Sequence, residues 1–288
     1  MRRAFVIGTF DNIGSQDIRF LHEASRLGEL HVFLFSDEIL ARYGRTPKFP
    51  LAERRYFLES IRYVHQVDIL CDELKLPQLL VHSILKRISE DDVCVVRKSL
   101  SEHEDALSKT IESFCREHGL AYCILSHDDL RGFPYEPPKA TEHSRDSTAE
   151  GRTRKVLVTG SFDWLHSGHI RFFEEAAMYG QLIVVVGNDA NIRLLKGDGH
   201  PLYGEEERRY LVGSIRYVSE ALISTGSGWL DAEPEILRLK PHMYIVNEDG
   251  DKPEKRSFCA THGIEYLVLK RIPREGLPYR SSTDLRGF

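Results

Sequence analysis

The stretch "KVLVTGSFDWLHSGHIRFFEEAA", residues 155–177, decides the fold of this chain. An apolar run rich in β-branched residues ends at Gly160, and an amphipathic segment begins a few residues later, after a polar loop. This order predicts a strand, a loop and a helix, the opening of a βαβ unit in a parallel sheet. Ligands of such sheets bind beyond the carboxyl ends of the strands. We therefore expect the loop after Gly160 to face a ligand.

The chain contains a second version of this stretch. Residues 8–20 read "GTFDNIGSQDIRF" and residues 160–172 read "GSFDWLHSGHIRF". Two further pairs follow in the same order: "RRYFLESIRYV" (54–64) with "RRYLVGSIRYV" (208–218), and "SHDDLRGF" (126–133) with "SSTDLRGF" (281–288). Three landmarks in one order predict a duplicated domain.

Each copy alternates short β-branched runs with amphipathic stretches. Such alternation predicts an α/β fold in which each domain is a parallel sheet with helices on both faces. Between the copies lies a segment rich in proline and charge, without apolar periodicity, which predicts a linker. The expected organisation is a first domain at 1–133, a linker at 134–154 and a second domain at 155–288.

Composition limits the classes of partner. The 288 residues carry a formal net charge of -5, which argues against broad nucleic-acid binding. The apolar run in "MRRAFVIGTF" is too short for a signal peptide, and no later run is long enough to span a membrane. The five cysteines show no CxxC pairing and lie mostly in apolar runs, so we expect reduced thiols and a cytoplasmic protein.

Two histidines at the predicted helix start carry the chemical signal of the second copy. His166 and His169 are three residues apart, so they share one face near a helix N-terminus, which attracts anions. Gly160 and Gly168 allow the backbone to approach a ligand closely. A phosphate fits these features, whereas the alternative is one capping and one packing histidine. No third ligand has the spacing of a zinc site.

Three motifs together resemble a known family. "GSFDWLHSGH" (160–169), "SIRYVSEA" (214–221) and "REGLPYRSSTDL" (274–285) resemble the signature segments of cytidylyltransferases in the HxGH nucleotidyltransferase superfamily, especially those acting on glycerol 3-phosphate and ethanolamine phosphate. "NDANIRLLKGDGHPL" (188–202) is also similar to heptose-phosphate adenylyltransferases. The resemblance implies two tandem Rossmann-like nucleotidyltransferase domains, of which the first is degenerate.

The implied reaction joins a nucleoside triphosphate to a phosphorylated alcohol and releases pyrophosphate. Because a phosphomonoester is already an anionic nucleophile, the site needs alignment and charge stabilisation more than a general base. The resemblance assigns catalytic roles to His166, His169 and Lys196, although a solvated lysine is the plain alternative for the last. Mg²⁺ is expected to bind mainly through the triphosphate, without a dedicated protein metal site.

The remaining site residues also follow from the resemblance. Arg216 has a counterpart, Arg62, in the first copy and is open to a structural role, and the spacing leaves Arg274 and Arg280 as alternatives for one phosphate arginine. The segment "VNEDGDK" departs from the family pattern. Its residues Asn247, Glu248 and Asp249 are assigned to the acceptor pocket. The nucleotide-binding set is Gly160, Ser161, Phe162, Asp163, Gly168, Arg216, Arg274, Arg280, Ser281, Ser282 and Thr283.

The first copy lacks the catalytic side chains. Gly14, Gln16 and Asp17 stand where the second copy has His166, Gly168 and His169, and an aspartate at a helix start repels a triphosphate. We expect this copy to be non-catalytic and to serve as the partner in an intramolecular pseudo-dimer, with further homo-oligomers open. A rival interpretation gives a regulatory anion to the basic residues Arg42, Arg97 and Lys98.

The resulting hypothesis is a CTP-dependent nucleotidyltransferase acting on a small phosphorylated alcohol, polyol or sugar. An ATP-dependent adenylyltransferase for a sugar or cofactor phosphate is the alternative within enzymes. A non-catalytic nucleotide sensor is the alternative from another class. A dinucleotide-binding oxidoreductase is disfavoured because neither first strand leads into GxGxxG.

Overall fold

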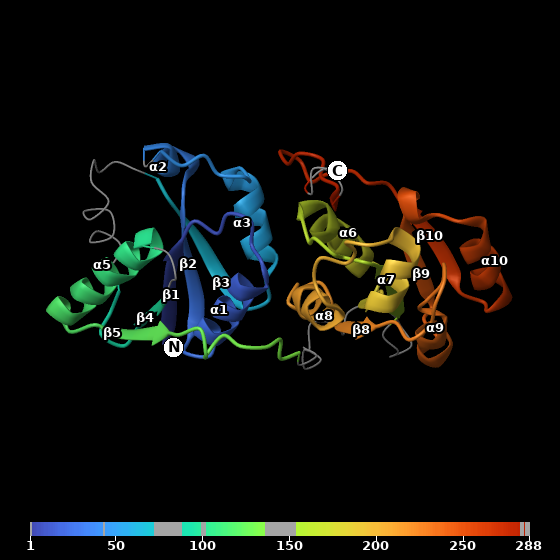
Figure 1. Cartoon of the computed structure of the whole chain (residues 1–288), viewed down its shortest axis with the longest axis horizontal. Helices are drawn as coiled ribbons and strands as arrows, with labels where there is room; N and C mark the ends of the chain where they lie inside the picture. The colour runs from blue at the N-terminus through green and yellow to red at the C-terminus, as the bar shows by residue number, and fades with distance from the viewer. Residues whose placement is uncertain are drawn as a thin grey trace. The chain divides into compact units, whose positions relative to one another are not determined.

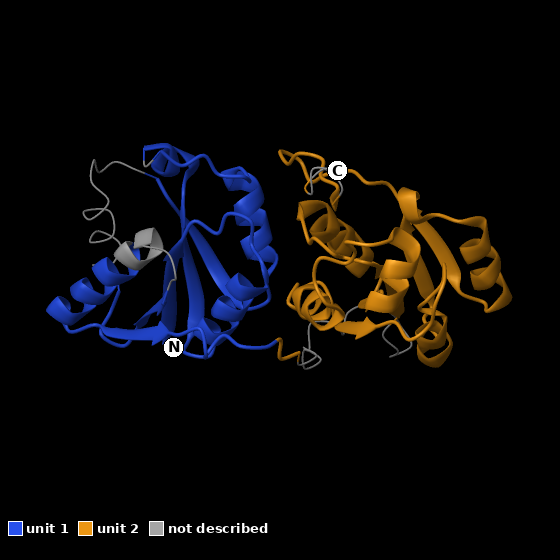
Figure 2. Ribbon diagram, viewed as in Figure 1, with its two compact units in different colours: residues 1–132 blue, residues 133–288 orange. Residues whose placement is uncertain are grey.

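The chain forms two compact units, residues 1–132 and 133–288 (Figure 2). The computed structural model describes residues 2–42, 44–71, 88–98, 102–135, 154–282 and 285. Within these ranges no helix is both long and apolar enough to cross a membrane. All five cysteines are free thiols.

Unit 1 is a five-stranded parallel sheet in the order β3-β2-β1-β4-β5. Figure 1 shows α1 and α3 on one side of this sheet and α5 on the other. The described elements are β1 (Arg3–Gly8), α1 (Ser15–Ser25), β2 (Glu29–Phe35), α2 (Asp37–Arg42), α3 (Leu51–Ser60), β3 (Val64–Leu70), β4 (Val93–Arg97), α5 (Glu102–His118) and β5 (Ala121–Leu125).

Unit 2 repeats this topology, with the strand order β8-β7-β6-β9-β10 and every pair parallel. The prediction of parallel sheets covered by helices is therefore confirmed for both units (Figure 1). Its elements are β6 (Lys155–Gly160), α6 (Ser167–Ala177), β7 (Gln181–Val186), α7 (Asp189–Lys196), α8 (Glu205–Gly213), β8 (Glu220–Ile223), α9 (Glu233–Leu239), β9 (Met243–Asn247), the 3₁₀ turn η2 (Glu248–Gly250), α10 (Pro253–Thr261) and β10 (Glu265–Leu269).

The edge strands β3 and β8 were not among the predicted strands. Within the repeated "RRY…SIRYV" segments, α3 ends at Ser60 and α8 at Gly213, and each strand follows shortly after. β3 has the sequence VHQVDIL, in which polar residues interrupt the apolar run, and β8 has only four residues. Edge strands bury less of their surface, so their sequences carry a weaker apolar signal.

The central position of β6 places the functional loop. β6 lies between β7 and β9, where the order of strands along the chain reverses, and its Val156, Leu157 and Val158 are fully buried. Crevices at such a reversal, beyond the carboxyl ends of the strands, are the usual ligand sites of open parallel sheets. The loop from Gly160 to His166 leaves β6 at this point.

The predicted linker differs from the structure at its first residues. The backbone N–H of Ala221 donates to Tyr135 Oη at 2.6 Å, and the guanidinium of Arg209 lies over the Tyr135 ring. A Cβ at Gly213 would come within 2.3 Å of the same ring. Residues 133–135 are thus packed as part of unit 2. The rest of the linker, residues 136–153, lies outside the described residues.

Candidate functional site

The loop after β6 is shaped by a glycine and a phenylalanine. Phe162 has φ +46°, a left-handed conformation that is uncommon outside glycine. Its ring folds back over Gly160, where a Cβ would lie 2.7 Å from a ring carbon. Phe10 has φ +44° and covers Gly8 in the same way. This loop shape is therefore common to both units and is independent of the histidines.

Asp163 anchors the loop to the segment that precedes α8. Its Oδ1 accepts the backbone N–H groups of Leu202, at 2.8 Å, and Tyr203, at 3.1 Å. In unit 1 the carboxylate of Asp11 accepts the corresponding N–H groups of Lys48 and Phe49. Asp163 is buried, and the two hydrogen bonds it accepts hold the loop in place.

His166 and His169 lie together at the start of α6. His166 is the N-cap, and its Nδ1 accepts the N–H of Gly168 at 3.1 Å. The ring of His169 stacks on that of His166, with centroids 3.9 Å apart, and meets Phe162 edge to face. The structure thus satisfies the capping alternative and also brings both imidazoles to the helix end expected to attract anions.

The environment keeps His169 neutral. Burial lowers its pKa well below the usual range of histidine, and the neighbouring His166, Arg271 and Lys196 lower the pKa further. A hydrogen bond with the backbone of Trp164 raises the pKa but does not offset these effects. Its Nδ1 is buried, and no hydrogen-bond partner for this atom lies among the described residues. A neutral imidazole with a positive surrounding is suited to accept an anionic ligand.

The absence of a side chain at Gly168 lets two groups approach its backbone closely. A Cβ there would lie 3.0 Å from the His166 ring and 3.3 Å from the carbonyl oxygen of Arg280. The loop that carries Arg280 therefore packs directly against the start of α6. The glycine predicted to allow close approach does so for protein atoms in this structure.

Lys196 reaches the same loop from the end of α7. Its Nζ donates to Ser161 Oγ at 2.9 Å. Desolvation lowers the pKa of Lys196, and the charge of Arg208 lowers it further. Two of the predicted site residues, on different elements, are thereby joined beside the histidine pair.

Arg208 holds this region together and was missed by the sequence analysis. Its fully buried guanidinium donates to the carbonyls of Tyr203, at 2.8 Å, and Ser161, at 2.7 Å, and to Asp189 Oδ1 at 2.7 Å. The side chain thus joins the loop after β6, the start of α7 and the start of α8. The only sequence signal for a buried arginine was the repeated "RRY". An exposed arginine on a helix would give the same pattern.

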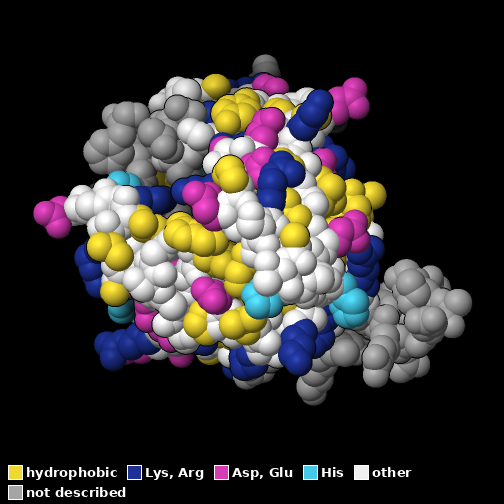
Figure 3. All heavy atoms as spheres, turned by 90° about the vertical axis from the view of Figure 1, so that its right-hand side faces the viewer, with side chains coloured by type: hydrophobic (Ala, Val, Ile, Leu, Met, Phe, Trp, Pro, Cys, Tyr) yellow, Lys and Arg dark blue, Asp and Glu magenta, His cyan; other side chains and the backbone are white. Residues whose placement is uncertain are grey.

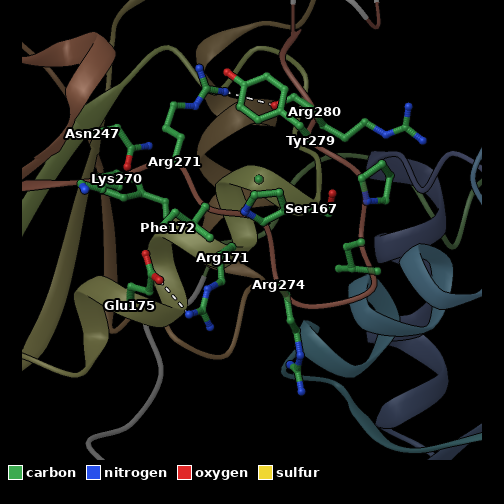
Figure 4. Close-up of a pocket in the computed structure, with 15 residues that line it drawn as sticks. Ser167, Arg171, Phe172, Glu175, Asn247, Lys270, Arg271, Arg274, Tyr279 and Arg280 are labelled. Atoms are coloured by element: carbon green, nitrogen blue, oxygen red, sulfur yellow. Dashed lines mark hydrogen bonds and ion pairs between the residues drawn. The ribbon is translucent and has the colours of Figure 1, made fainter.

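A hollow with a basic lining adjoins the N-terminus of α6. The space of about 390 Å³ opens to solvent. Figure 4 shows Arg271 and Tyr279 on one side, Arg171 and Glu175 on the opposite side, and Ser167 between them. Among the described lining residues, Glu175 is the one carboxylate against five basic side chains: Arg171, Lys270, Arg271, Arg274 and Arg280.

Arg271 is held in place by several contacts, and it too was missed. Its guanidinium donates to Asp249 Oδ2 at 2.9 Å and to the carbonyl of Arg280 at 3.1 Å, and it lies over the Tyr279 ring. Its backbone N–H donates to Glu248 Oε1 at 3.4 Å. The predicted acceptor residues Glu248 and Asp249 therefore orient a cation, and Asn247 lines the hollow.

The other predicted residues fall into three groups. Arg274 and Arg280 both line the hollow, and Arg274 donates to Glu174 at 3.4 Å, so the spacing ambiguity between them persists. Ser282 Oγ donates to the carbonyl of Trp164 at 3.4 Å. The carbonyl of the neighbouring Ser281 accepts the backbone N–H of Leu285. Arg216 is exposed and is not among the lining residues, and Thr283 lies outside the described residues.

Unit 1 fills the equivalent helix start with its own side chains. Asp17 Oδ2 accepts the N–H of Gly14 at 2.9 Å, and Asp17 Oδ1 is 3.1 Å from Arg97 Nη1. The expected repulsion of a phosphate by Asp17 is thus balanced by an arginine of β4. The same ion pair engages Arg97, one of the three basic residues considered for a regulatory anion.

Comparisons with known proteins place unit 2 among relatives of known class. A family model described as "Cytidylyltransferase-like" matches residues 157–283. An FAD synthase of Archaeoglobus profundus is 32% identical over 134 residues, which is 46% of this chain and 83% of that protein. An FAD synthase of Thermococcus kodakarensis is 37% identical, over 41% of this chain and 79% of that protein. The bifunctional protein HldE of Pelobacter propionicus is 35% identical over 34% of this chain, but the match spans only 19% of HldE.

These matches and the site establish the class of the protein as an enzyme that transfers a nucleotidyl group. More specifically, the chain belongs to the cytidylyltransferase-like family of the nucleotidyltransferase superfamily. All of these alignments cover less than half of the chain, and the family model lies within unit 2.

Proposed function

We propose that unit 2 transfers an adenylyl group from ATP to a small acceptor that already carries a phosphate, with release of pyrophosphate. The observation that carries this proposal is the stacked His166–His169 pair at the N-terminus of α6, next to a hollow lined by five basic residues. The first feature fits the triphosphate and the second fits the acceptor phosphate.

In this reaction an oxygen of the acceptor phosphate attacks the α-phosphorus of the triphosphate. The new bond links the two phosphates, the bond from the α-phosphorus to the bridging oxygen breaks, and the electron pair leaves with pyrophosphate. Both reactants are anions, so the protein's contribution is to bring them together and to offset their charge.

The histidine pair and Lys196 suit the triphosphate. His169 is neutral in the free protein because of burial and neighbouring cations, and a polyphosphate placed beside it would raise its pKa and favour a donated proton. Lys196 Nζ donates to Ser161 Oγ in the free protein. It is therefore close enough to the loop to turn towards a phosphate oxygen. The free N–H groups of the first turn of α6 add further donors.

The basic hollow suits the acceptor. Arg271 is held by Asp249 and by the carbonyl of Arg280, so its guanidinium is positioned before any ligand binds. Guanidinium groups bind phosphate through two parallel hydrogen bonds, and a fixed orientation lowers the entropy lost on binding. Asn247 at the end of β9 adds an amide that can recognise a hydroxyl or carbonyl of the acceptor.

Magnesium is expected to accompany the triphosphate. The described part of unit 2 brings no three imidazole, thiol or carboxylate groups close together, so the residues present do not form a protein cage for a cation. They fit a Mg²⁺ ion held mainly by phosphate oxygens, which adds positive charge at the reacting phosphates.

The choice of ATP departs from the first expectation of CTP. FAD, the product named in several relatives, contains an adenine nucleotide joined through two phosphates, which supports adenylyl transfer. CTP is the second candidate, favoured by the resemblance of "GSFDWLHSGH" to cytidylyltransferases. The acceptors to be tested are therefore phosphorylated cofactors, sugars and polyols.

Unit 1 is proposed to be non-catalytic. It has Gly14 and Asp17 in place of the histidines, and Asp17 is paired with Arg97. It retains the loop anchor Asp11 and the same sheet topology. The retained scaffold fits the role of a tethered partner for unit 2, at an effective concentration on the order of mM.

A pyrophosphate-release screen tests the proposal. The four nucleoside triphosphates are each combined with a panel of phosphorylated cofactors, sugars and polyols, using the full chain and Mg²⁺. We expect a signal with ATP and one acceptor class, and its loss in His169→Asn. His262→Gln, at the end of α10, is the control that should retain the signal. A signal with CTP alone selects the second candidate, and no signal with any pair would favour a nucleotide sensor.

A further inference from the structure

Unit 1 contains a cluster of metal-ligating side chains at the amino end of its sheet. Glu29 and His31 lie two residues apart on β2, and His65 lies on the neighbouring strand β3. One ligand atom from each of the three lies within 4.8 Å of those of the other two. Side chains two residues apart on a strand share a face, so Glu29 and His31 form one side of the cluster.

An irregularity in the strand pairing adds His65 to the cluster. Leu30 pairs with Val64 but His31 pairs with Gln66, so His65 is the extra residue of a bulge between β2 and β3. Bulges redirect a side chain relative to the regular alternation. The His31 and His65 rings lie 5.5 Å apart and are inclined by 29°. The backbone distortion and the cluster therefore occur at the same place.

The three side chains differ in exposure as the ligands of an accessible ion would. His31 is 9% exposed, and its ring rests against Phe5 with centroids 5.3 Å apart. Glu29 is half-buried and His65 is exposed. The buried ligand is thus fixed by packing, and solvent reaches the cluster from the side of His65.

The positive charge of Arg3 acts on His31, but Arg3 also has a carboxylate partner of its own. Arg3 lies opposite Glu29 in the pairing of β1 with β2. Its guanidinium is bound to both carboxylate oxygens of Asp92, at 3.1 and 2.6 Å. The positive charge of Arg3 is therefore paired with the carboxylate of Asp92. Asp68, farther along β3, adds negative charge near His31 and accepts hydrogen bonds from Gln66.

Unit 2 provides a comparison without these ligands. Gln181 and Ile183 occupy the positions of Glu29 and His31 on β7, and Ser219 occupies that of His65. Ile183 is a buried core residue. Unit 1 thus has an imidazole where the same fold holds an aliphatic side chain, together with a second imidazole and a carboxylate in reach of it.

We propose that unit 1 binds one divalent transition-metal ion of the zinc type through Glu29, His31 and His65, with a water molecule as the fourth ligand. Two imidazoles and a carboxylate are a known ligand set for zinc with an open fourth position. The ion would join the edge strand β3 to β2 across the bulge. The cluster lies near the start of β2, at the opposite end of the strands from the loop that carries Asp11. This proposal does not depend on the proposed transferase activity.

The test is metal titration of the full, tag-free chain after treatment with a chelator and without nucleotide. All proteins carry Cys71→Ser, because Cys71 is exposed and thiolates in general bind zinc. Zn²⁺ binding is followed by calorimetry, and Co²⁺ binding by its visible absorption. We expect one ion per chain, and at least tenfold weaker binding in His65→Gln and in Glu29→Gln.

A matched variant and a stability measurement complete the test. His118→Gln removes a histidine at the end of α5, and it should bind zinc as the parent does. Both tryptophans, Trp164 and Trp229, lie in unit 2, so their fluorescence reports that unit alone. Zinc should raise the circular-dichroism melting temperature of the parent but not that of His65→Gln, and it should leave the tryptophan transition unchanged. Equal affinity of the parent and His65→Gln would overturn the proposal, as would less than half an ion per chain.

Discussion

Arg54 and Arg208 make three corresponding hydrogen bonds, one set in each unit. Arg54 donates to the carbonyls of Phe49, at 3.0 Å, and Thr9, at 2.6 Å, and to Asp37 Oδ1 at 2.6 Å. Each of these three partners corresponds to a partner of Arg208, and Arg54 donates in addition to the carbonyl of Phe35 at 3.0 Å. Both guanidinium groups are almost completely buried. A charge that is buried with three bonded acceptors is costly to remove, because the acceptors then lack donors.

Replacement of Arg208 should destabilise unit 2 specifically. In Arg208→Met the carbonyls of Tyr203 and Ser161 and the carboxylate of Asp189 lose their donor, and we expect a loss of about 3–5 kcal/mol in the free energy of unfolding. Urea unfolding followed by tryptophan fluorescence measures it, since both tryptophans belong to unit 2. Arg54→Met should leave this transition in place while destabilising unit 1.

The control is Arg55→Met. Arg55 is half exposed and bonds Glu59 one helical turn away, so its loss should cost less than about 1 kcal/mol. If Arg208→Met and Arg55→Met have the same tryptophan transition, the buried arginine does not stabilise unit 2 as its bonds indicate.

Addition of one methyl group at Gly168 should impair the site without unfolding the protein. The new Cβ would lie 3.0 Å from the His166 ring and 3.3 Å from the Arg280 carbonyl, so one of them must move. We expect Gly168→Ala to lower kcat for pyrophosphate release at least tenfold, with an unchanged tryptophan unfolding transition. Gln16→Ala, at the equivalent position of unit 1, is the matched control and should retain full activity. Full activity in Gly168→Ala would show that the contact yields at no cost.

The alternation of strands and helices, the loop after Gly160 and the histidine pair were all predictable from the sequence. Local pattern carries them, because a β-branched run, a glycine and a helix start are adjacent in the chain. Arg208 and Arg271 were not predictable, because their burial and their partners arise from segments far apart in sequence. Arg216, which a motif position selected, is exposed, and its role in nucleotide binding stays a prediction.

Acid should weaken unit 2 through His169. Its pKa in the folded state is lowered by burial and by His166, Arg271 and Lys196. Below the unfolded-state pKa of about 6.5, the unfolded chain binds a proton that the folded chain does not, so stability falls as pH decreases. The loss approaches about 1.4 kcal/mol per pH unit for one such group. We expect the tryptophan transition to shift less between pH 7.5 and 5.5 in His169→Asn than in the parent; equal shifts would assign the effect elsewhere.

Arg271 should control the acceptor more than the nucleotide. Arg271→Met removes a guanidinium held by Asp249 and the Arg280 carbonyl, and we expect KM for the phosphorylated acceptor to rise at least tenfold with KM for ATP within about twofold. Initial rates with each substrate varied in turn measure both constants. Arg256→Met, on the exposed face of α10, is the control. An equal rise in both KM values would place Arg271 at the triphosphate instead.

Equivalent substitutions in the two units should have opposite consequences. His169→Asn should lower kcat by about 10²–10³, the cost of one lost donor at a reacting phosphate. Asp17→Asn, at the same position of unit 1, should leave kcat unchanged. It should destabilise unit 1 by less than about 1 kcal/mol, because the Asp17–Arg97 pair is partly exposed. Comparable loss of kcat in both variants would contradict a non-catalytic unit 1.

Mixed charge over the exposed face of unit 2 agrees with small substrates. Figure 3 shows basic and acidic side chains interspersed over the described part of this face. With a net charge of -5, the chain offers little long-range attraction for a polyanion. Under the proposed function, recognition of a phosphate would depend on the local cations of the hollow.

The ion pair of Asp17 and Arg97 also gives unit 1 an anion of its own. The carboxylate of Asp17 is attached to helix α1 and contacts both Arg97 and the backbone N–H of Gly14, so it cannot diffuse away. A soluble anion competes with a group whose effective concentration is on the order of mM or above. The carboxylate of Asp17 therefore competes, as a part of the chain itself, with any soluble anion for Arg97.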